Sequence, residues 1–315
     1  MVSNWVGAGE ELIGQKILIT GVTGQIAFPL ASHLAQHNNV WGLARFGAPG
    51  SRARVEGIGV TPVECDLDEG DLSSVPTDFD YLLHLAAFQG PGNDFDYALR
   101  ANAEATGFVL QHCREARAAL VMSTHSVYKP NADPRHAYRE TDPMGDVNPQ
   151  HSPTYSVAKI GQEAVARFCS RAYGLAVTIA RMNAAYGPNG GLPALNADSI
   201  AAGSPVWTRW GPCLYSPIYQ DDINAQAAAL LAAAATPATI VNWAGDDAVS
   251  VQEWCTYAGE LLHKPAEVIV RPVEGTLRGS VAEVSKRLAI TGPCAVDWRE
   301  GMRRTVEARH PQSSV

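Results

Sequence analysis

Short apolar segments recur along the 315-residue chain as far as residue 245, and segments of helical character separate them. The first, KILIT at 16–20, is a run of apolar and β-branched residues flanked by glycine, which is typical of a buried strand. Further segments of this kind are predicted as strands at 40–45, 60–67, 81–87, 119–128, 176–182 and 239–245. Nearly uniform apolar strands that alternate with helices predict a parallel sheet covered on both faces, which is a doubly wound α/β fold.

The stretch ITGVTGQIA follows the first predicted strand directly and leads into a helix. Gly21 permits a tight turn, Gly24 lets a pyrophosphate approach the backbone, and the small Ala27 lets the helix pack on the strand. Free N–H groups and the positive dipole end of the helix then face the phosphates. The turn predicts a dinucleotide-binding site, with Gln25 and Ile26 as further contacts, unless it is an ordinary turn without a ligand.

The segment that would meet the adenosine ribose carries arginine instead of a carboxylate. In sheets of this kind, an Asp or Glu about 20 residues beyond the glycines selects an unphosphorylated 2′-hydroxyl. No acidic residue lies between Val40 and Arg54, whereas Arg45 ends the second strand and Arg52 and Arg54 are nearby. Because a guanidinium fits a 2′-phosphate, we predict NADP in preference to NAD, with Arg45 at the site. The alternative is that these arginines only solvate a loop.

TYSVAK places Tyr155 and Lys159 four residues apart on a predicted helix, so the two side chains share one face. A lysine beside a tyrosine hydroxyl favours the phenolate, so we expect the pKa of Tyr155 to fall. Such a tyrosine can exchange a proton with an alcohol or carbonyl while hydride moves to or from a nicotinamide. The alternative is a surface pair of polar residues. Ser123, Thr124 and Ser126 lie at the end of a strand at the ligand-binding edge and are candidates to hold the substrate oxygen.

A series of motifs in order resembles one family: TGVTGQIA, CDL, HLAA, the Asn of RANAEATG, STHSVY, YSVAK, RMNAAYGP and IYQDDI. They resemble the extended short-chain dehydrogenase/reductase family, also called the NAD-dependent epimerase/dehydratase family, over nearly the whole chain to about residue 308. The resemblance implies a Rossmann sheet, a nicotinamide dinucleotide and a homodimer. We expect a dinucleotide-binding domain over 14–182, to which 215–245 partly returns. A smaller C-terminal substrate-binding domain is expected over 183–214 and 246–310.

The resemblance also implies roles for individual residues. Tyr155 is the catalytic acid/base, Lys159 is its partner and holds the nicotinamide ribose, Thr124 is the catalytic hydroxyl, and Asn102 belongs to the proton-relay set. Further contacts to the cofactor are expected from Asp66, Leu67, Ala86 and Ala87. Residues expected to meet the substrate are Phe88, His125, Ser126, Asn183 and Tyr215.

Two positions depart from the patterns of better-defined members of the family. Sugar 4,6-dehydratases carry an Asp-Glu pair after the catalytic Thr, where this chain has His125 and Ser126. Nucleotide-sugar enzymes usually place an arginine before the Y-x-D-D segment, where this chain has Tyr215 and Ser216, and Arg278 is the substitute considered. A dehydratase is therefore not expected, and a nucleotide-diphospho-sugar substrate is less expected.

The net charge, the cysteine pattern and the absence of long apolar runs limit the partners and the location that we expect. A net charge of −8 makes a nucleic-acid partner unexpected. The six cysteines are scattered without a C-x-x-C pair, so neither a disulfide framework nor a metal site is predicted. No apolar run reaches the ~18 residues of a membrane span, and the first 15 residues do not resemble a signal peptide, so we expect a cytoplasmic protein. His84 is expected to be a core histidine, and His151 a loop histidine.

We therefore predict an NADP-dependent oxidoreductase, with NAD as the alternative cofactor. It would move hydride at a secondary alcohol or ketone of a sugar-like or other cyclic small molecule, with a tyrosine as acid/base. The first alternative is a nucleotide-sugar epimerase that regenerates its NAD within each turnover. An alternative of another class is a dinucleotide-binding sensor without catalysis.

Overall fold

The computed structural model describes residues 12–147 and 152–311, so His151 and the first 11 residues, which carried predictions, lie outside the described residues. The chain divides into two compact units, which are described separately below. Unit 1 comprises Met1–Val127, Gln150–Arg181 and Asn224–Val241. Unit 2 comprises Tyr128–Pro149, Met182–Ile223 and Asn242–Val315.

A seven-stranded sheet in the order β12-β7-β5-β4-β1-β2-β3 is the centre of the fold. Its strands are β1 (Lys16–Thr20), β2 (Asn39–Ala44), β3 (Thr61–Glu64), β4 (Tyr81–His84), β5 (Ala118–Thr124), β7 (Val177–Met182) and β12 (Thr239–Trp243). Register is parallel from β1 outward, where Ile17 pairs with Val40 of β2 and with Tyr81 of β4. All seven predicted strands are present, and the doubly wound α/β fold is confirmed.

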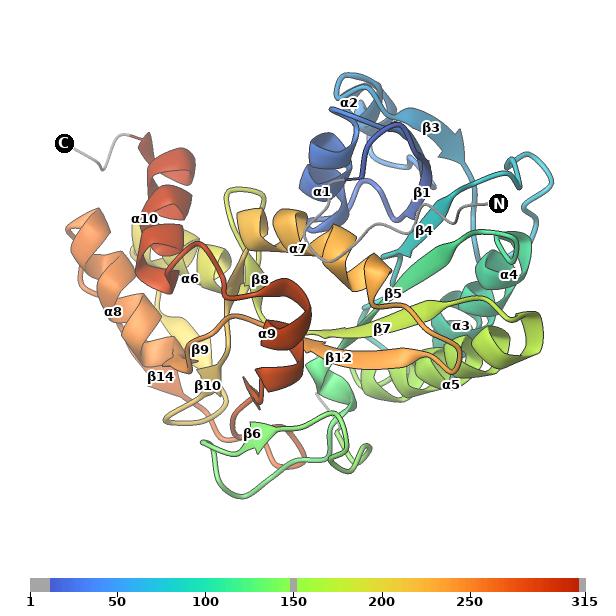
Figure 1. Ribbon diagram of the computed structural model, residues 1–315. Helices are drawn as coiled ribbons and strands as arrows, with labels where there is room; N and C mark the ends of the chain where they lie inside the picture. The colour runs from blue at the N-terminus through green and yellow to red at the C-terminus, as the bar shows by residue number, and fades with distance from the viewer. Residues whose placement is uncertain (1–11, 148–151, 312–315) are drawn as a thin grey trace. The chain divides into compact units, whose positions relative to one another are not determined.

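Helices cover both faces of this sheet (Figure 1). They are α1 (Ala27–Leu34), α2 (Ser51–Glu56), α3 (Phe95–Leu99), the π-helix η1 (Arg100–Glu104), α4 (Ala105–His112), α5 (Tyr155–Tyr173) and α7 (Gln220–Ala232), with a 3₁₀ turn, η2, at His125–Val127. Alternation along β7 separates the faces. Val177 and Ile179 pack with residues of α4 and α5, whereas Thr178 points to the other face and donates to the carbonyl of Leu230 on α7 at 2.7 Å.

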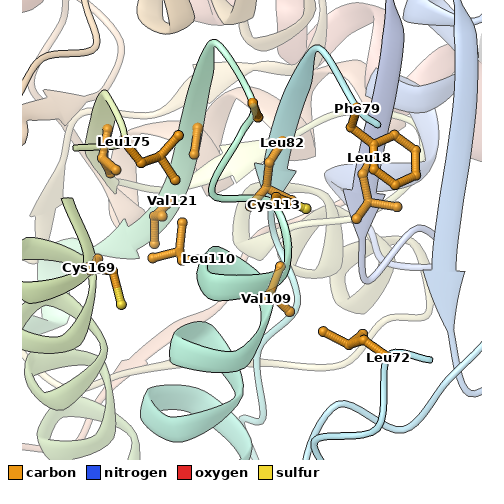
Figure 2. Packing of buried hydrophobic residues seen from close by; sticks show 14 of the residues in the cluster. Leu18, Leu72, Phe79, Leu82, Val109, Leu110, Cys113, Val121, Cys169 and Leu175 are labelled. Carbon is orange, nitrogen blue, oxygen red and sulfur yellow. The ribbon is translucent and has the colours of Figure 1, made fainter. Parts of the chain in front are cut away.

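The core on the α4 and α5 side is built almost entirely from aliphatic side chains and thiols (Figure 2). Leu18, Leu82 and Val121 project from adjacent strands, and Val109 and Leu110 of α4 pack onto them. All five are fully buried. Because a parallel sheet leaves no strand face in water, this packing accounts for the near-continuous apolar runs in the sequence.

Unit 2 combines short paired strands with helices. The strands are β6 (Ala137–Tyr138), β8 (Ala185–Tyr186), β9 (Val206–Thr208), β10 (Leu214–Tyr215), β11 (Ile218–Tyr219), β13 (Val249–Ser250), β14 (Val268–Val270) and β15 (Val281–Ala282). The helices are α6 (Leu192–Ala201), α8 (Val251–Leu262), α9 (Ser285–Thr291) and α10 (Trp298–Arg309). Ser250 and Glu253 form a capping box that starts α8, whose buried Trp254 packs in the core of this unit.

Residues 128–149 depart from the predicted domain boundaries, because they belong to unit 2 and not to the dinucleotide-binding unit. The hydroxyl of Tyr128 donates to Oδ1 of Asn242 at 2.5 Å, and β6 pairs in parallel with β15. The partner of Tyr128 lies 114 residues further along the chain, so local sequence patterns carry no sign of this assignment.

Candidate cofactor and catalytic site

The turn after β1 has the geometry that its glycines were expected to provide. Gly21 has φ of +69°, its N–H donates to the carbonyl of Leu43 at 2.8 Å, and the N–H of Gly24 donates to the carbonyl of Gly21 at 2.8 Å. A Cβ placed on Gly21 would lie 2.8 Å from the Cα of Ala86. Position 21 therefore requires glycine for two reasons: its backbone is left-handed, and the chain just beyond β4 leaves no space for a Cβ.

A cavity of about 500 Å³ opens at the carboxyl ends of β1, β2, β3 and β4. Most of the residues predicted to bind a cofactor line it: Gly21, Gly24, Arg45, Asp66, Leu67, Ala86 and Ala87, together with Phe88 from the predicted substrate set. Lining residues without a sequence prediction are Thr23, Leu43, Ala44, Cys65, Asp68, Leu85, Tyr97 and Ala101. Most of these, including Ala101 next to Asn102, are neighbours of predicted residues, whereas Tyr97 comes from α3, for which no site residue was predicted. Gln25 and Ile26 lie at the start of α1 and are not among the lining residues.

A second cavity of about 690 Å³ adjoins the first and shares Thr23 and Arg45 with it. Arg54 lines it with its guanidinium carbon 3.7 Å from the centre of the Phe28 ring, a stacked arrangement. The Arg45 side chain is 64% exposed, and its Nη1 is 4.0 Å from Oδ2 of Asp66. At this distance and exposure the ion pair is weak, so the Arg45 guanidinium is available to an anionic ligand.

Tyr155 begins α5, and its hydroxyl shares a hydrogen bond with Thr124 at the end of β5. Burial raises the pKa of Tyr155 to about 12, and the bond with Thr124 opposes this rise. We expected the pKa to fall below its ordinary value because of Lys159. The structure shows the opposite, because the loss of hydration outweighs the neighbouring groups. At neutral pH the hydroxyl is therefore protonated.

Lys159 lies one helical turn further on and is almost completely buried, with 1% of its surface exposed. Its Nζ donates to the carbonyl of Met122 on β5 at 2.7 Å. Burial lowers its pKa to about 7, and the carboxylate of Glu163 acts in the opposite direction. The ammonium and the neutral amine thus have similar populations near neutral pH.

A chain of buried hydrogen bonds begins at the end of β1. The Thr20 hydroxyl accepts from the N–H groups of Leu85 and Ala86 at 3.2 and 3.1 Å, so its own proton goes to Nδ1 of His84 at 2.8 Å. Nε2 of His84 then carries the ring proton and donates to the Thr106 hydroxyl at 2.8 Å. Burial and Lys159 lower the pKa of His84 to about 3, which agrees with this neutral tautomer. His84 is therefore the satisfied core histidine that was predicted.

Asn102 ends this chain from within the π-helix η1. The backbone carbonyl of Asn102 accepts from the Thr106 hydroxyl at 2.6 Å. Its side-chain Oδ1 accepts from the N–H of Phe88 at 2.8 Å, and its Nδ2 donates to the carbonyl of Phe88 at 3.0 Å. The amide thus fixes the backbone of a cavity-lining residue, and π-helical turns are frequent at functional sites.

The residues predicted to meet substrate are divided between the units. In unit 1, His125 is buried in the turn η2, and the carbonyl of Ser126 accepts from Oγ of Ser156 at 2.6 Å. In unit 2, Asn183 uses its amide internally: Nδ2 donates to the carbonyl of Ser280 at 2.6 Å, and Oδ1 accepts from the N–H of Ser216 at 3.0 Å.

Two half-buried arginines of unit 2 stand beside aromatic rings. Nη2 of Arg209 donates to the hydroxyl of Tyr215 at 3.3 Å, and the guanidinium carbon of Arg278 is 4.6 Å from the centre of the Trp210 ring. Within the part of the chain that the structure describes, neither arginine makes an ion pair with a carboxylate. Sequence reasoning did not select Arg209, because it lies six residues before Tyr215 and outside the motif.

Residues 12–147 and 152–311 contain no candidate metal centre and no membrane-spanning helix. No cluster of three or more His, Cys, Asp or Glu side chains in these ranges is arranged to hold a metal ion. No helix there combines the length and apolar character needed to cross a membrane.

Comparison with known families gives one match over most of the chain. The model of the NAD dependent epimerase/dehydratase family matches residues 17–244, and the chain belongs to this family. The match confirms the family resemblance, and with it an enzyme of the extended short-chain dehydrogenase/reductase type. No sequence among curated proteins matches the chain.

Solved structures with a similar fold include several epimerases. The UDP-glucuronic acid 4-epimerase from Bacillus cereus, in complex with UDP-glucuronic acid and NAD, has a TM-score of 0.82 and 21% identity over 94% of this chain and 99% of that one. The UDP-glucose 4-epimerase from Thermus thermophilus, in complex with NAD, has a TM-score of 0.78 and 23% identity over 94% and 99%. The UDP-N-acetylglucosamine 4-epimerase from Methanobrevibacter ruminantium has a TM-score of 0.80 and 19% identity over 96% and 100%.

Gly21→Ala tests the turn. We expect a loss of stability of about 1–3 kcal/mol from the left-handed backbone, with a further loss from the contact with Ala86. Gly59→Ala is the matched control, because Gly59 has φ of +78° and no atom within 4 Å of a built Cβ. Urea unfolding measures both. Equal losses in the two variants would show that the approach of β4 does not constrain position 21.

Lys159→Met tests the buried lysine. Between about pH 7 and its ordinary pKa of 10.5, the unfolded chain binds more protons at this lysine than the folded protein does. Stability of the wild type should therefore rise with pH across this window. We expect the stability advantage of Lys159→Met over the wild type to shrink as pH rises from about 7 to about 10. Lys286→Met, at an exposed position, should show no such trend. A stability advantage of Lys159→Met that does not change with pH would contradict the lowered pKa of Lys159.

Proposed function

We propose that this protein is an NADP-dependent oxidoreductase that moves hydride at a secondary alcohol or ketone of a sugar-like or other cyclic small molecule. The observation that carries the proposal is the place of Tyr155, at the start of α5 and beside Thr124 at the carboxyl end of β5. The neighbouring strand β4 leads into Ala86 and Ala87, which line the cavity behind the glycine turn. A proton-transfer pair and a dinucleotide-sized cavity thus occupy one edge of the sheet.

The residues of this edge fit a nicotinamide dinucleotide. The glycine turn and the start of α1 would hold its phosphates, Asp66 and Leu67 its adenine, and Lys159 its nicotinamide ribose. When bound, the nicotinamide supplies or accepts the hydride. Tyr155, whose raised pKa keeps its hydroxyl protonated at neutral pH, donates that proton to the carbonyl oxygen that becomes the alcohol. Thr124 holds the same oxygen, and the ammonium of Lys159 stabilises the phenolate that remains.

The preference for NADP is supported by the second cavity. Arg45 lies at the boundary of the two cavities and is only weakly paired with Asp66. Arg54 lines the same cavity and is oriented by its stacking on Phe28. Two guanidinium groups in that position suit a 2′-phosphate.

Arg45→Ala tests this preference. We expect the wild type to bind NADPH at least tenfold tighter than NADH, about 1.4 kcal/mol, and the substitution to remove the difference. Arg52→Ala is the matched control, because the Arg52 side chain is paired with Glu56 at 3.3 Å. Fluorescence titration of the three proteins with both nucleotides measures the six affinities. Equal or tighter binding of NADH by the wild type would contradict the role of Arg45.

Epimerisation of an anionic sugar derivative is the second candidate, and the arginines of unit 2 favour it. Arg209 and Arg278 carry positive charge beside Tyr215 and Trp210 without a carboxylate partner among the described residues. Such a pair suits a phosphate or diphosphate. Two of the similar solved structures are NAD complexes of a UDP-glucuronic acid 4-epimerase and a UDP-glucose 4-epimerase.

Tyr155→Phe tests whether the site is catalytic. We expect the rate of carbonyl reduction to fall by a factor of about 10²–10⁴, because the proton donor is lost, while NADPH binding is retained. Consumption of NADPH, followed by absorbance with a panel of cyclic ketones and sugars, separates a reductase from an epimerase, which consumes none. A variant that keeps the full biological function of the wild type would favour the non-catalytic sensor.

A homodimer is supported by an exposed apolar face on α4 and α5. Phe108, Val157 and Phe168 are 40%, 45% and 64% exposed, and all three come from these two adjacent helices. Pairing of this face with a second copy would remove the three side chains from water. Cytoplasmic localisation is supported by five buried cysteine thiols, which suit a reducing compartment.

Phe168→Glu tests the dimer. We expect the wild type to sediment as a dimer and the variant as a monomer, because a charge in the paired face would lose its hydration. Leu195→Glu, at a 55% exposed position on α6, should remain dimeric. A monomeric wild type at micromolar concentration would overturn this proposal.

A further inference from the structure

Glu163 is a buried carboxylate that the proposed mechanism does not use. It follows Tyr155 and Lys159 on α5 at intervals of four residues, so the three side chains lie on one face of the helix. Its side chain is 2% exposed. Carboxylates are rarely buried to this extent unless other groups hold their charge.

Three donors from two strands hold this carboxylate in place. Oγ of Ser123 on β5 donates to Oε1 at 2.5 Å. From β7, Nε of Arg181 donates to Oε1 at 2.9 Å, and Nη2 donates to Oε2 at 2.8 Å. A two-point arginine contact with an added hydroxyl fixes the orientation of the carboxylate.

Few of the groups near Lys159 carry charge. His84 on β4 is neutral, and Tyr155 keeps its proton at neutral pH. On β5 the contact is the uncharged carbonyl of Met122. Arg181 on β7 is bound to Glu163. Among the described residues, Glu163 is thus the carboxylate that opposes the effect of burial on the lysine.

We propose that Glu163, held by Ser123 and Arg181, is a positioning residue that keeps Lys159 charged in its buried site beside Tyr155. A buried lysine without a nearby anion loses its proton readily. The neutral amine would no longer stabilise a phenolate at Tyr155. The catalytic consequence rests on the proposed function, whereas the effect on the lysine itself does not.

The ionisation of Lys159 can be measured directly. The chain has five lysines, so a protein labelled with ¹³C at lysine Cε gives few side-chain signals, and the one lost in Lys159→Met identifies Lys159. We expect this signal to titrate near pH 7 in the wild type and about one pH unit or more lower in Glu163→Gln. Glu104→Gln, at an exposed position of the same unit, should leave the titration unchanged.

A double variant controls for the unpaired charge that Glu163→Gln leaves in the core. Glu163→Gln leaves Arg181 buried without its counterion, so the double variant Glu163→Gln with Arg181→Met is prepared alongside it. The Lys159 titration should move to lower pH in this variant as well. A folded variant of either kind in which Lys159 titrates as in the wild type would overturn the proposal and leave Glu163 as a structural link between α5 and the sheet.

The pH profile of reduction separates this proposal from the proposed function. If hydride transfer depends on charged Lys159, the alkaline limb of the rate should move to lower pH in Glu163→Gln by the same interval as the lysine signal. A wild type without activity on any carbonyl would contradict the proposed function, whereas the lysine titration would still decide the role of Glu163. A shifted titration with an unshifted rate profile would overturn the catalytic part of the role.

Discussion

The close approach of β1 and β4 is the constraint on which the rest of the site depends. The Thr20 hydroxyl binds the backbone just beyond β4, and Gly21 leaves no space for a side chain against Ala86. The same hydroxyl begins the hydrogen-bond chain through His84 that ends at Asn102. One buried network therefore fixes the floor of the cavity, and a fixed floor lets a ligand bind without ordering the protein first.

Burial also determines the chemistry of the side chains at this edge. Burial raises the pKa of Tyr155, so that the hydroxyl keeps its proton, and lowers the pKa of Lys159, so that the ammonium loses its proton more readily. In each case the cause is that the charged form loses its hydration. The buried pair of Glu163 and Arg181 need not add to stability, since buried ion pairs often contribute little. Contacts with Ser123 of β5 and Arg181 of β7 fix the Glu163 carboxylate one helical turn from Lys159 on α5.

The sequence was informative where local patterns decide the outcome. Apolar runs located all seven strands of the sheet, and the spacing of Gly21 and Gly24 located the turn. It was not informative where distant contacts decide: residues 128–149 join unit 2 through Asn242, and Arg209 reaches Tyr215 from outside any motif. The pKa of Tyr155 was predicted in the wrong direction, because spacing reveals a neighbouring lysine but not the loss of water around both side chains.

The central claim is that the edge formed by β1, β2, β4 and β5 binds a nicotinamide dinucleotide beside Tyr155. A crystal structure of the wild-type protein with NADPH tests this most directly. We predict the diphosphate at the turn from Gly21 to Gly24, the 2′-phosphate at Arg45, and the nicotinamide ribose at Lys159. A nucleotide bound elsewhere, or one whose nicotinamide lies far from the Tyr155 hydroxyl, would contradict the account.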